Sequence, residues 1–340
     1  MSQLPEQPAA ATVPTSADVA RVAGVSRATV SYVLNNNATV RISEQTRRRV
    51  REAASGLGYV PHAAARSLRA GHSRMVLLPS WHSPSGPLHQ RFFHALQSDL
   101  RRLDYTVVQY GSAGLDADGA ARSWAELRPV AVVSPGGPAL TPYGIDVLTR
   151  SGAKAVITLG PQPVEGAHAL VMDQRVVGSC AVAHLLARGR RRIGVVLPQE
   201  PGLALFGEPR LAGARRTAEA AGASVLPLPL RYEEESAARL AAGWRTFGLD
   251  AVFAYNDEYA MLLMRALQDA GVAVPGETAV IGADDLMLGR LLRPRLSTVR
   301  MELAAGQAPA ELIDRLVRHP GGTPERHDLL RASAVPRQSS

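Results

Sequence analysis

The sequence predicts an α/β protein with a three-helix N-terminal unit followed by a large body of alternating strands and helices. Helix-capping patterns recur within residues 15–58, and from Met75 onward apolar strand-like runs alternate with amphipathic helical stretches. Such alternation is typical of parallel sheets built from βαβ units. The 340 residues suffice for at least two folding units, because domains usually contain about 100–200 residues.

The positive charge of the chain is concentrated near its N-terminus. The net charge is +8, and residues 1–75 contain ten arginines and four acidic residues, a net charge of +6. A basic unit before a nearly neutral body is typical of nucleic-acid binding through one end, although an anionic membrane would attract it too. With Cys180 as the single cysteine, and with no secretory leader or membrane-spanning run, we expect a cytoplasmic protein without an intrachain disulfide.

Residues typical of helix ends indicate the first two helices of the N-terminal unit. Thr15 and Asp18 form a capping-box pattern that starts a helix, and Gly24 ends it. Ser26 is the expected N-cap of a second helix. The apolar residues that share one face of this second helix are Val30, Val33 and Leu34.

A third helix completes the unit. The pattern Ser43-x-x-Thr46 opens it, and it continues to about Ser55. Three short helices with a glycine turn between the first two indicate a helix-turn-helix domain over residues 15–58. Residues 1–14 are rich in Pro, Ala and Gln and are expected to form a disordered leader.

The body begins after a short connecting segment. Residues 59–73 are expected to form a hinge, because the alanine-rich stretch 62–70 is too short for a stable isolated helix. The predicted strands are 75–78, 105–110, 130–133, 155–159, 193–197, 251–255 and 279–282. The predicted helices are about 89–103, 175–188, 209–221, 235–247 and 258–270. These strands fit either one doubly wound sheet or two smaller sheets, and the periodicity of the apolar residues does not distinguish the two arrangements.

The segment from Asp18 to Asn35, DVARVAGVSRATVSYVLN, closely resembles the headpiece signature of the LacI/GalR family of bacterial transcriptional regulators. Further matches follow in order over about residues 16–338. They are Asp173 before Val177-Gly178, His184-Leu185-Leu186, Gly189 to Ile193, Arg210-x-x-Gly213, Tyr255-Asn256-Asp257, Gly282 to Asp285 and Pro294 to Val299.

The resemblance implies a helix-turn-helix headpiece, a hinge helix and a two-lobed doubly wound body like that of periplasmic binding proteins. The amino lobe is expected at about 74–185 and 300–328, and the carboxyl lobe at about 186–299 and 329–338. It also implies a transcription repressor that binds a pseudopalindromic operator as a homodimer. A small effector, a sugar or a related polar metabolite, would control it allosterically, with no cofactor.

The resemblance and the geometry of helix-turn-helix domains assign residues to DNA. Arg27 and Ala28 lie at the N-terminal end of the second helix, nearest the base edges. Arg27 suits guanine O6 and N7, with a phosphate contact as the alternative, and Ala28 suits a thymine methyl. Tyr32 stands where the best-known family members carry arginine. The short side chains suited to phosphate oxygens are Ser26, Thr29, Ser31 and Asn35.

In the hinge, the resemblance makes Leu68 an apolar wedge that enters the minor groove and kinks the duplex. Ala65 and Arg69 would lie beside it, and packing of Leu68 into the body is the alternative. His62 stands where the family usually has Asn.

In the body, the resemblance makes Asp173, Arg210, Asn256 and Asp284 the polar effector contacts. Asp173 and Asn256 have an alternative as helix caps. Trp81, in a loop that departs from the family sequence, is suited to stack on a sugar ring, with His82 a weaker candidate and a buried aromatic the alternative. The residues expected to stabilise backbone turns instead are Asp257 and Asp285.

The sequence lacks the motifs that are typical of other classes of protein. No Gly-x-Gly-x-x-Gly or Gly-Lys-Ser/Thr loop follows a predicted strand, so a nucleotide-dependent enzyme is disfavoured. Cys180 is solitary, which disfavours metal or covalent catalysis. A secreted solute-binding protein would lack the headpiece and carry an export signal. The arginine run 188–192 is interpreted as a solvated turn rather than a second nucleic-acid patch.

Overall fold

The computed structural model describes residues 13–34, 40–60, 73–80, 87–112, 114–134, 140–161, 163–303 and 308–340. The chain divides into two compact units, residues 1–73 and 74–340. Each is described by itself. None of the described helices is long and apolar enough to cross a membrane.

The N-terminal unit contains the predicted three helices, α1 (Ser16–Ala23), α2 (Arg27–Leu34) and α3 (Glu44–Gly56). The capping box is present, because the Asp18 carboxylate accepts the Thr15 N–H at 3.0 Å while the Thr15 hydroxyl oxygen accepts the Asp18 N–H. Gly24 follows α1 with a φ of 63°, a left-handed conformation that glycine adopts without strain. The buried core comprises Val19, Ala20, Ala23, Val30, Val33, Val50, Ala53 and Ala54. The predicted helix-turn-helix fold is confirmed.

The body contains two six-stranded sheets, which resolves the alternative that periodicity left open. The sheet of the amino lobe has the order β11-β5-β4-β3-β1-β2, and all its pairings are parallel. Its strands are β1 (Met75–Ser80), β2 (Thr106–Gly111), β3 (Ala131–Ser134), β4 (Ala155–Gly160), β5 (His168–Val171) and β11 (Arg326–Asp328). Its helices are α5 (Pro87–Arg102), α6 (Ala117–Glu126), α7 (Pro142–Arg150) and α13 (Pro309–Arg318).

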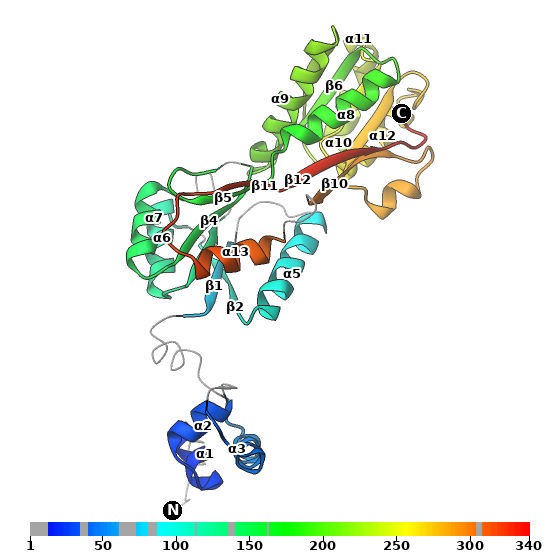
Figure 1. The fold of residues 1–340 in the computed structure, drawn as a ribbon. Coiled ribbons are helices and arrows are strands. Elements are labelled where there is room, and N and C mark those ends of the chain that lie inside the picture. The colour runs from blue at the N-terminus through cyan, green and yellow to red at the C-terminus, as the bar shows by residue number, and fades with distance from the viewer. Residues whose placement is uncertain are drawn as a thin grey trace, which may run out of the picture. The chain divides into compact units, whose positions relative to one another are not determined.

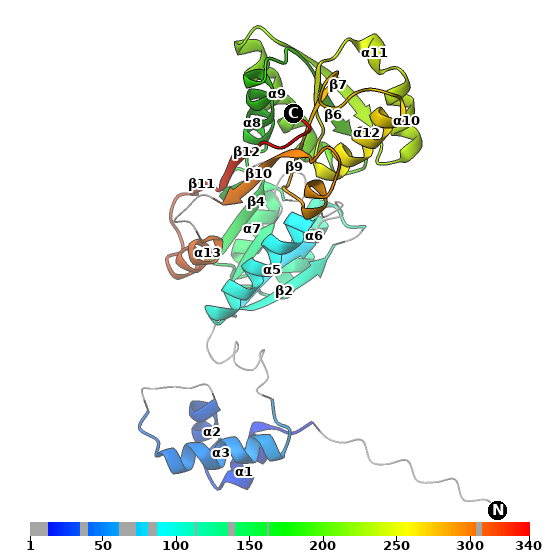
Figure 2. The same ribbon diagram turned by 90° about the vertical axis from the view of Figure 1, so that its right-hand side faces the viewer.

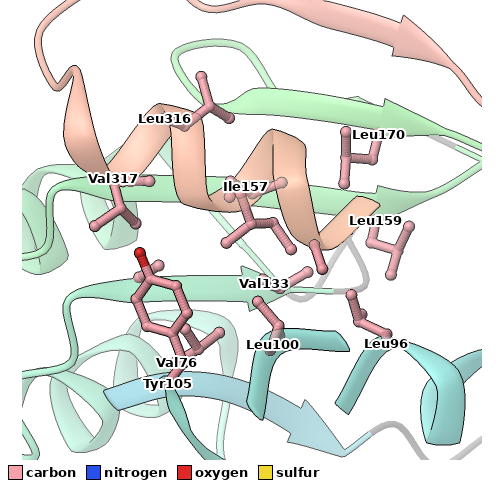
Figure 3. Close-up of a cluster of buried hydrophobic side chains, with 14 of the residues drawn as sticks. Val76, Leu96, Leu100, Tyr105, Val133, Ile157, Leu159, Leu170, Leu316 and Val317 are labelled. Carbon is pink, nitrogen blue, oxygen red and sulfur yellow. The ribbon is translucent and has the colours of Figure 1, made fainter. Parts of the chain in front are cut away.

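The amino-lobe sheet is covered on both faces. Leu96 and Leu100 of α5 and Ile313 of α13 pack with Val133 and Ile157 of the strands on one face, as Figure 3 shows for most of these side chains. On the other face, α6 and α7 pack against the alternate strand residues, in a cluster that comprises Leu77, Ala121, Trp124, Val132, Leu148 and Val156. This burial of both faces explains the almost continuous apolar runs in the sequence.

The sheet of the carboxyl lobe has the order β12-β10-β9-β8-β6-β7, with only β10 and β12 antiparallel among its pairings. Its strands are β6 (Arg192–Pro198), β7 (Ser224–Leu230), β8 (Ala251–Phe253), β9 (Ala279–Ala283), β10 (Ser297–Leu303) and β12 (Leu330–Val335). Its helices are α8 (Arg175–Ala187), α9 (Ala204–Ala220), α10 (Glu234–Ala242), α11 (Trp244–Phe247) and α12 (Asp257–Asp269), with a 3-10 turn η2 (Met287–Arg290). Figures 1 and 2 show the two lobes joined by the segments before α8 and between β11 and β12.

The lobe boundary differs from the expectation at two places. The expected amino lobe reached residue 185, but Val177, Val182 and Leu185 of α8 pack in the carboxyl-lobe core with α9 and β6. Residues 300–303 also belong to the carboxyl-lobe sheet, because β10 pairs with β9 and β12. Both differences arise from contacts between segments far apart in the chain.

Several elements were not expected or have different limits. The sequence prediction omitted β5, β7, β10, β11, α6, α7 and α13, and only the resemblance implied the last strand, β12. The expected helix 235–247 is divided into α10 and α11 at Gly243. The expected helix 209–221 begins earlier, at Ala204, so that Pro209 lies inside α9. The expected strand 251–255 ends at Phe253, because the backbone then turns to place Asn256 as the N-cap of α12.

Candidate DNA-binding and ligand-binding sites

The outer face of α2 is a candidate DNA-binding surface. Val30 and Val33 are buried in the three-helix core, whereas Arg27 and Ala28 are exposed and Tyr32 keeps 38% of its surface accessible. The helix therefore presents its first turn and the residues one turn later on the side opposite its core. These are the positions that a recognition helix directs at base edges.

Ser26 caps α2, as the sequence predicted. Its hydroxyl accepts the backbone N–H of Thr29 at 3.1 Å and lies 2.9 Å from the Thr29 hydroxyl. This local bond fixes the start of the recognition helix and leaves Ser26 exposed. The other predicted DNA contacts in and near the hinge, Asn35, Ala65, Leu68 and Arg69, lie outside the described residues, as does His62.

The ligand-binding candidates are organised around Arg210, which lies on α9 and is only 5% exposed. Its Nε and Nη2 both donate to Oε1 of Gln174, at 3.0 and 2.8 Å, and its Nη1 donates to the backbone oxygen of Tyr255. The guanidinium carbon lies 4.6 Å from the centroid of the Tyr255 ring. A guanidinium has five N–H donors; these bonds use three of them, and Nη2 also donates to the Met301 sulfur at 3.8 Å.

Two glycines bring Arg210 to Gln174. A Cβ at Gly178 of α8 would lie 1.8 Å from the backbone oxygen of Arg210, and a Cβ at Gly213 of α9 would lie 2.0 Å from that of Arg175. Because α8 and α9 touch backbone to backbone at these glycines, the start of α8 meets the Arg210 side chain. Both glycines lie within the motifs that carry the resemblance.

Asn256 performs the capping role that the sequence left open. Its Oδ1 accepts the N–H of Tyr259 at 3.0 Å as the N-cap of α12, and its Nδ2 donates to Glu258 at 3.3 Å. The Asn256 side chain also opposes the rise in the pKa of the Asp284 carboxyl.

Asp284 follows β9 in an unusual conformation, with a φ of 104°. Its N–H donates to the backbone oxygen of Val299 at 2.9 Å. Burial raises the pKa of its carboxyl to about 6, with a smaller raising effect from Glu258 and opposing effects from Arg210 and Arg91. Arg91 belongs to α5, so this carboxyl interacts electrostatically with the amino lobe as well. Arg210, Asn256 and Asp284 thus lie around Tyr255.

Asp173 lies directly before Gln174, which is the N-cap of α8 and forms no side-chain cap bond. The Asp173 carboxylate accepts the N–H of Arg175 at 3.0 Å and lies 3.5 Å from the Arg175 Nε, with the side chain 33% exposed. Gln174 is also the partner of Arg210. Trp81 and His82 lie outside the described residues.

Asp257 stabilises the backbone, as expected. The fully buried Asp257 carboxyl accepts the Thr298 hydroxyl at 2.6 Å and the N–H of Leu286 at 2.7 Å, and burial raises its pKa to about 7. Its contacts hold the loop after β9 and the strand β10.

Asp285 has the same kind of role. Its carboxylate accepts bonds from three arginines on separate segments, Arg290, Arg300 and Arg337. Burial alone would raise the pKa of Asp285, but Arg337 and Arg300 hold it below the usual value.

The arginine run 188–192 is structural, as the sequence interpretation held. Arg190 donates to the backbone oxygen of Pro275 at 2.7 Å, and the backbone N–H groups of Arg191 and Arg192 donate to Asp250. These bonds connect the turn before β6 to neighbouring loops.

Sequence reasoning missed three members of the ligand-binding candidate. Gln174 and Tyr255 both contact Arg210, and their signal was only that each adjoins a predicted site residue. The third is Glu200, whose carboxylate accepts the Tyr259 hydroxyl and, at 2.6 Å, the N–H of Tyr232. Within the described ranges, no group of three or more His, Cys, Asp or Glu side chains could hold a metal ion.

Family models match both parts of the chain. Residues 15–62 match the model of bacterial regulatory proteins of the lacI family, and residues 182–340 match the periplasmic binding protein-like domain. The HTH-type transcriptional regulator GntR of Pseudomonas aeruginosa is 31% identical over 318 residues, which cover 89% of this chain and 89% of that protein.

Solved structures share the fold. The lac repressor dimer bound to operator and an anti-inducer has a TM-score of 0.73 at 21% identity, covering 96% of this chain and 98% of that one. The complex of the transcriptional regulator CelR with cellobiose has a TM-score of 0.61 at 24% identity, covering 96% of this chain and all of that one.

The two family models and the GntR relative show a DNA-binding transcription regulator with a periplasmic-binding-protein-like body, rather than an enzyme. The chain belongs to the LacI/GalR family of bacterial transcriptional regulators. The resemblance on which the sequence interpretation depended is confirmed.

Proposed function

We propose that this regulator is a repressor that binds a pseudopalindromic operator as a homodimer and leaves it when a carbohydrate-like effector binds. The observation that carries the proposal is the exposed face of α2, where Arg27, Ala28 and Tyr32 lie opposite the buried Val30 and Val33. A protein that regulates transcription in this way acts in the cytoplasm, at the nucleoid.

On DNA, Arg27 donates two hydrogen bonds to a guanine and Ala28 contacts a thymine methyl. The Tyr32 ring and hydroxyl contact a neighbouring base. The residues that bind phosphate oxygens are Ser26, Thr29, Ser31 and Asn35. In the hinge, Leu68 enters the minor groove with Ala65 and Arg69 beside it. Two headpieces read the two halves of the operator, and the lac repressor, which shares this fold, binds its operator as a dimer.

In the body, the effector contacts Asp284, Arg210 and Asn256, with Asp173 and Trp81 completing the site. Carboxylates accept hydrogen bonds from sugar hydroxyls, and the second N–H of Arg210 Nη1, which does not bind Tyr255, donates to them. The CelR–cellobiose complex supports a carbohydrate-like ligand for this fold.

Effector binding favours one relative orientation of the two lobes, which changes operator affinity through the hinge. Asp284 is suited to such coupling, because it interacts electrostatically with Arg91 of the amino lobe while it stands on a loop of the carboxyl lobe.

Selection of bound duplexes from random DNA with the full-length protein tests the DNA-binding proposal. The selected sequences should be two-fold symmetric. Arg27→Ala should cost about 1–3 kcal/mol and relax the preference at one base pair of each half-site. Arg47→Ala, the matched control on α3, should weaken binding to all sequences alike. Equal losses on selected and random DNA for Arg27→Ala would contradict base reading.

A ligand screen on the selected operator tests the effector proposal. A carbohydrate-like compound should lower operator affinity of the wild type. Asp284→Asn should abolish this response while it leaves affinity for the operator without ligand unchanged. The matched control, Asp146→Asn on α7, removes a carboxylate whose 2.9 Å pair with Arg150 is exposed, and it should respond as the wild type does.

A further inference from the structure

Arg74 is the first residue of the body unit, directly after the segment that joins it to the headpiece. Its Nε donates to the backbone oxygen of Asp104 at 2.9 Å, and its Nη2 donates to that of Leu103 at 2.7 Å. These carbonyls lie just beyond the C-terminal end of α5, where backbone oxygens lack partners within the helix and the helix dipole favours a cation. The side chain is therefore held by two charge-assisted bonds to the main chain.

The turn that receives Arg74 is itself firmly held. Tyr105 is buried, and its hydroxyl donates to Asp314 of α13 at 2.7 Å, where Arg318 also binds at 2.7 Å. Figure 3 shows the Tyr105 hydroxyl directed toward α13. The Arg74 guanidinium lies 5.0 Å from the centroid of the Tyr105 ring. Arg74 is thus connected to both helices that cover one face of the amino-lobe sheet.

The main chain of Arg74 is paired as well. Its backbone oxygen accepts the N–H of Thr106 at 3.0 Å, next to the parallel pairing of Met75 with Thr106 in β1 and β2. The residue at which the connecting segment enters the body is therefore held from two sides, by its backbone and by its side chain.

We infer that Arg74 is a positioning residue that sets which separation of operator half-sites the dimer accepts. The inference rests on the proposed binding of a two-half-site operator by a homodimer. When two headpieces are tethered to one dimeric body, the gain from engaging the second half-site depends on the reach and direction of each tether. Loss of the bonds that hold the Arg74 side chain to the body therefore broadens the range of half-site separations that the dimer accepts and reduces the gain from the second half-site.

The test compares full-length variants with matched charge. Arg74→Met keeps the apolar stem over Tyr105 and removes the guanidinium. Arg101→Met, the control, removes an exposed arginine from the end of α5, so both variants lose one positive charge and the same general attraction to DNA. Arg74→Lys keeps the charge without the planar fork that spans two carbonyls.

Affinity is measured for the operator selected by the wild type, for versions with one or two base pairs added or removed at the centre, and for a single half-site. Each added pair rotates the second half-site by about a tenth of a turn. The wild type and Arg101→Met should bind only the original spacing tightly. Arg74→Met should bind the original site about tenfold more weakly than Arg101→Met does. Its affinity should fall less than that of Arg101→Met when the spacing is altered, and the two variants should bind the single half-site equally well. Arg74→Lys should lie between them.

A spacing profile of Arg74→Met equal to that of Arg101→Met overturns the inference. Equal losses of Arg74→Met on the half-site and the full site, together with a lower urea midpoint, also overturn it, because they show a structural role only. If the wild type itself selects no two-half-site sequence, the proposed function fails instead.

Discussion

Gly178→Ala tests how closely α8 and α9 must pack to place Arg210. The new Cβ would lie 1.8 Å from the backbone oxygen of Arg210 and 3.1 Å from the nitrogen of Ala214. Since carbon and oxygen atoms in contact lie about 3.3 Å apart, α9 would have to move by roughly 1.5 Å. Such overpacking costs about 1–3 kcal/mol or more. The movement also separates Arg210 from Gln174, and an unpaired buried polar group costs about 1–3 kcal/mol further.

We therefore expect Gly178→Ala to lower the free energy of unfolding by about 3 kcal/mol or more. Urea unfolding of the full chain, followed by far-ultraviolet circular dichroism, measures it. Gly243→Ala is the matched control, because its Cβ would meet nothing closer than 3.9 Å and Gly243 has an ordinary φ of −91°. The control should change stability by less than about 1 kcal/mol. A loss below that value for Gly178→Ala would refute the backbone-to-backbone packing.

Three other predictions follow from the carboxyl groups and the division into units. Asp257 has a pKa of about 7 in the folded protein against an ordinary value of 3.8, so the folded state binds more protons between these values and stability falls as pH rises through them. Asp257→Asn should flatten this decline in urea midpoints measured from pH 4 to 7, and an unchanged slope would contradict the assignment. Asp285→Asn leaves three arginines without their shared carboxylate and should lower the free energy of unfolding by about 2–4 kcal/mol. Asp146→Asn, which breaks an exposed pair, should lower it by less than about 1 kcal/mol. Similar losses in the two variants would contradict a stabilising role for the three ion pairs of Asp285. Removal of residues 1–73 should abolish operator binding while the remaining body keeps its cooperative unfolding transition, since the two units are separately compact; operator binding by that fragment in a mobility-shift assay would disprove the division of tasks.

The headpiece could be predicted almost completely from sequence. Its helix ends depend on local hydrogen bonds, such as those between Thr15 and Asp18 and between Ser26 and Thr29. Its core depends on residues one helical turn apart, such as Val30 and Val33. Both kinds of signal lie within a few residues of one another, so the sequence displays them directly.

For the body, the sequence predicted only the fold class. Strands β11 and β12 lie at the edges of their sheets and alternate partly exposed residues with exposed ones, so they have no apolar run to mark them. The assignment of α8 to the carboxyl lobe depends on its contact with α9 at Gly178 and Gly213. No local pattern reports which sheet a helix will cover.

The ligand-binding candidates show the same limit. The resemblance pointed to Arg210, Asn256 and Asp284, and the structure brings them together around Tyr255. It also shows that Asn256 caps α12, a role the sequence had left as an alternative, whereas Asp173 bonds to the N–H of Arg175 but is not the N-cap of α8. The bond from Arg210 to Gln174 joins residues 36 positions apart.

The sequence by itself determined the three-helix headpiece, the α/β alternation of the body and the family, because caps, periodicity and motifs are local properties of the chain. The tertiary structure decided the two-sheet division, the lobe of α8, the partners of Arg210 and the anchoring of Arg74. These depend on contacts between segments tens of residues apart, whose geometry exists only once the sheets and helices have packed.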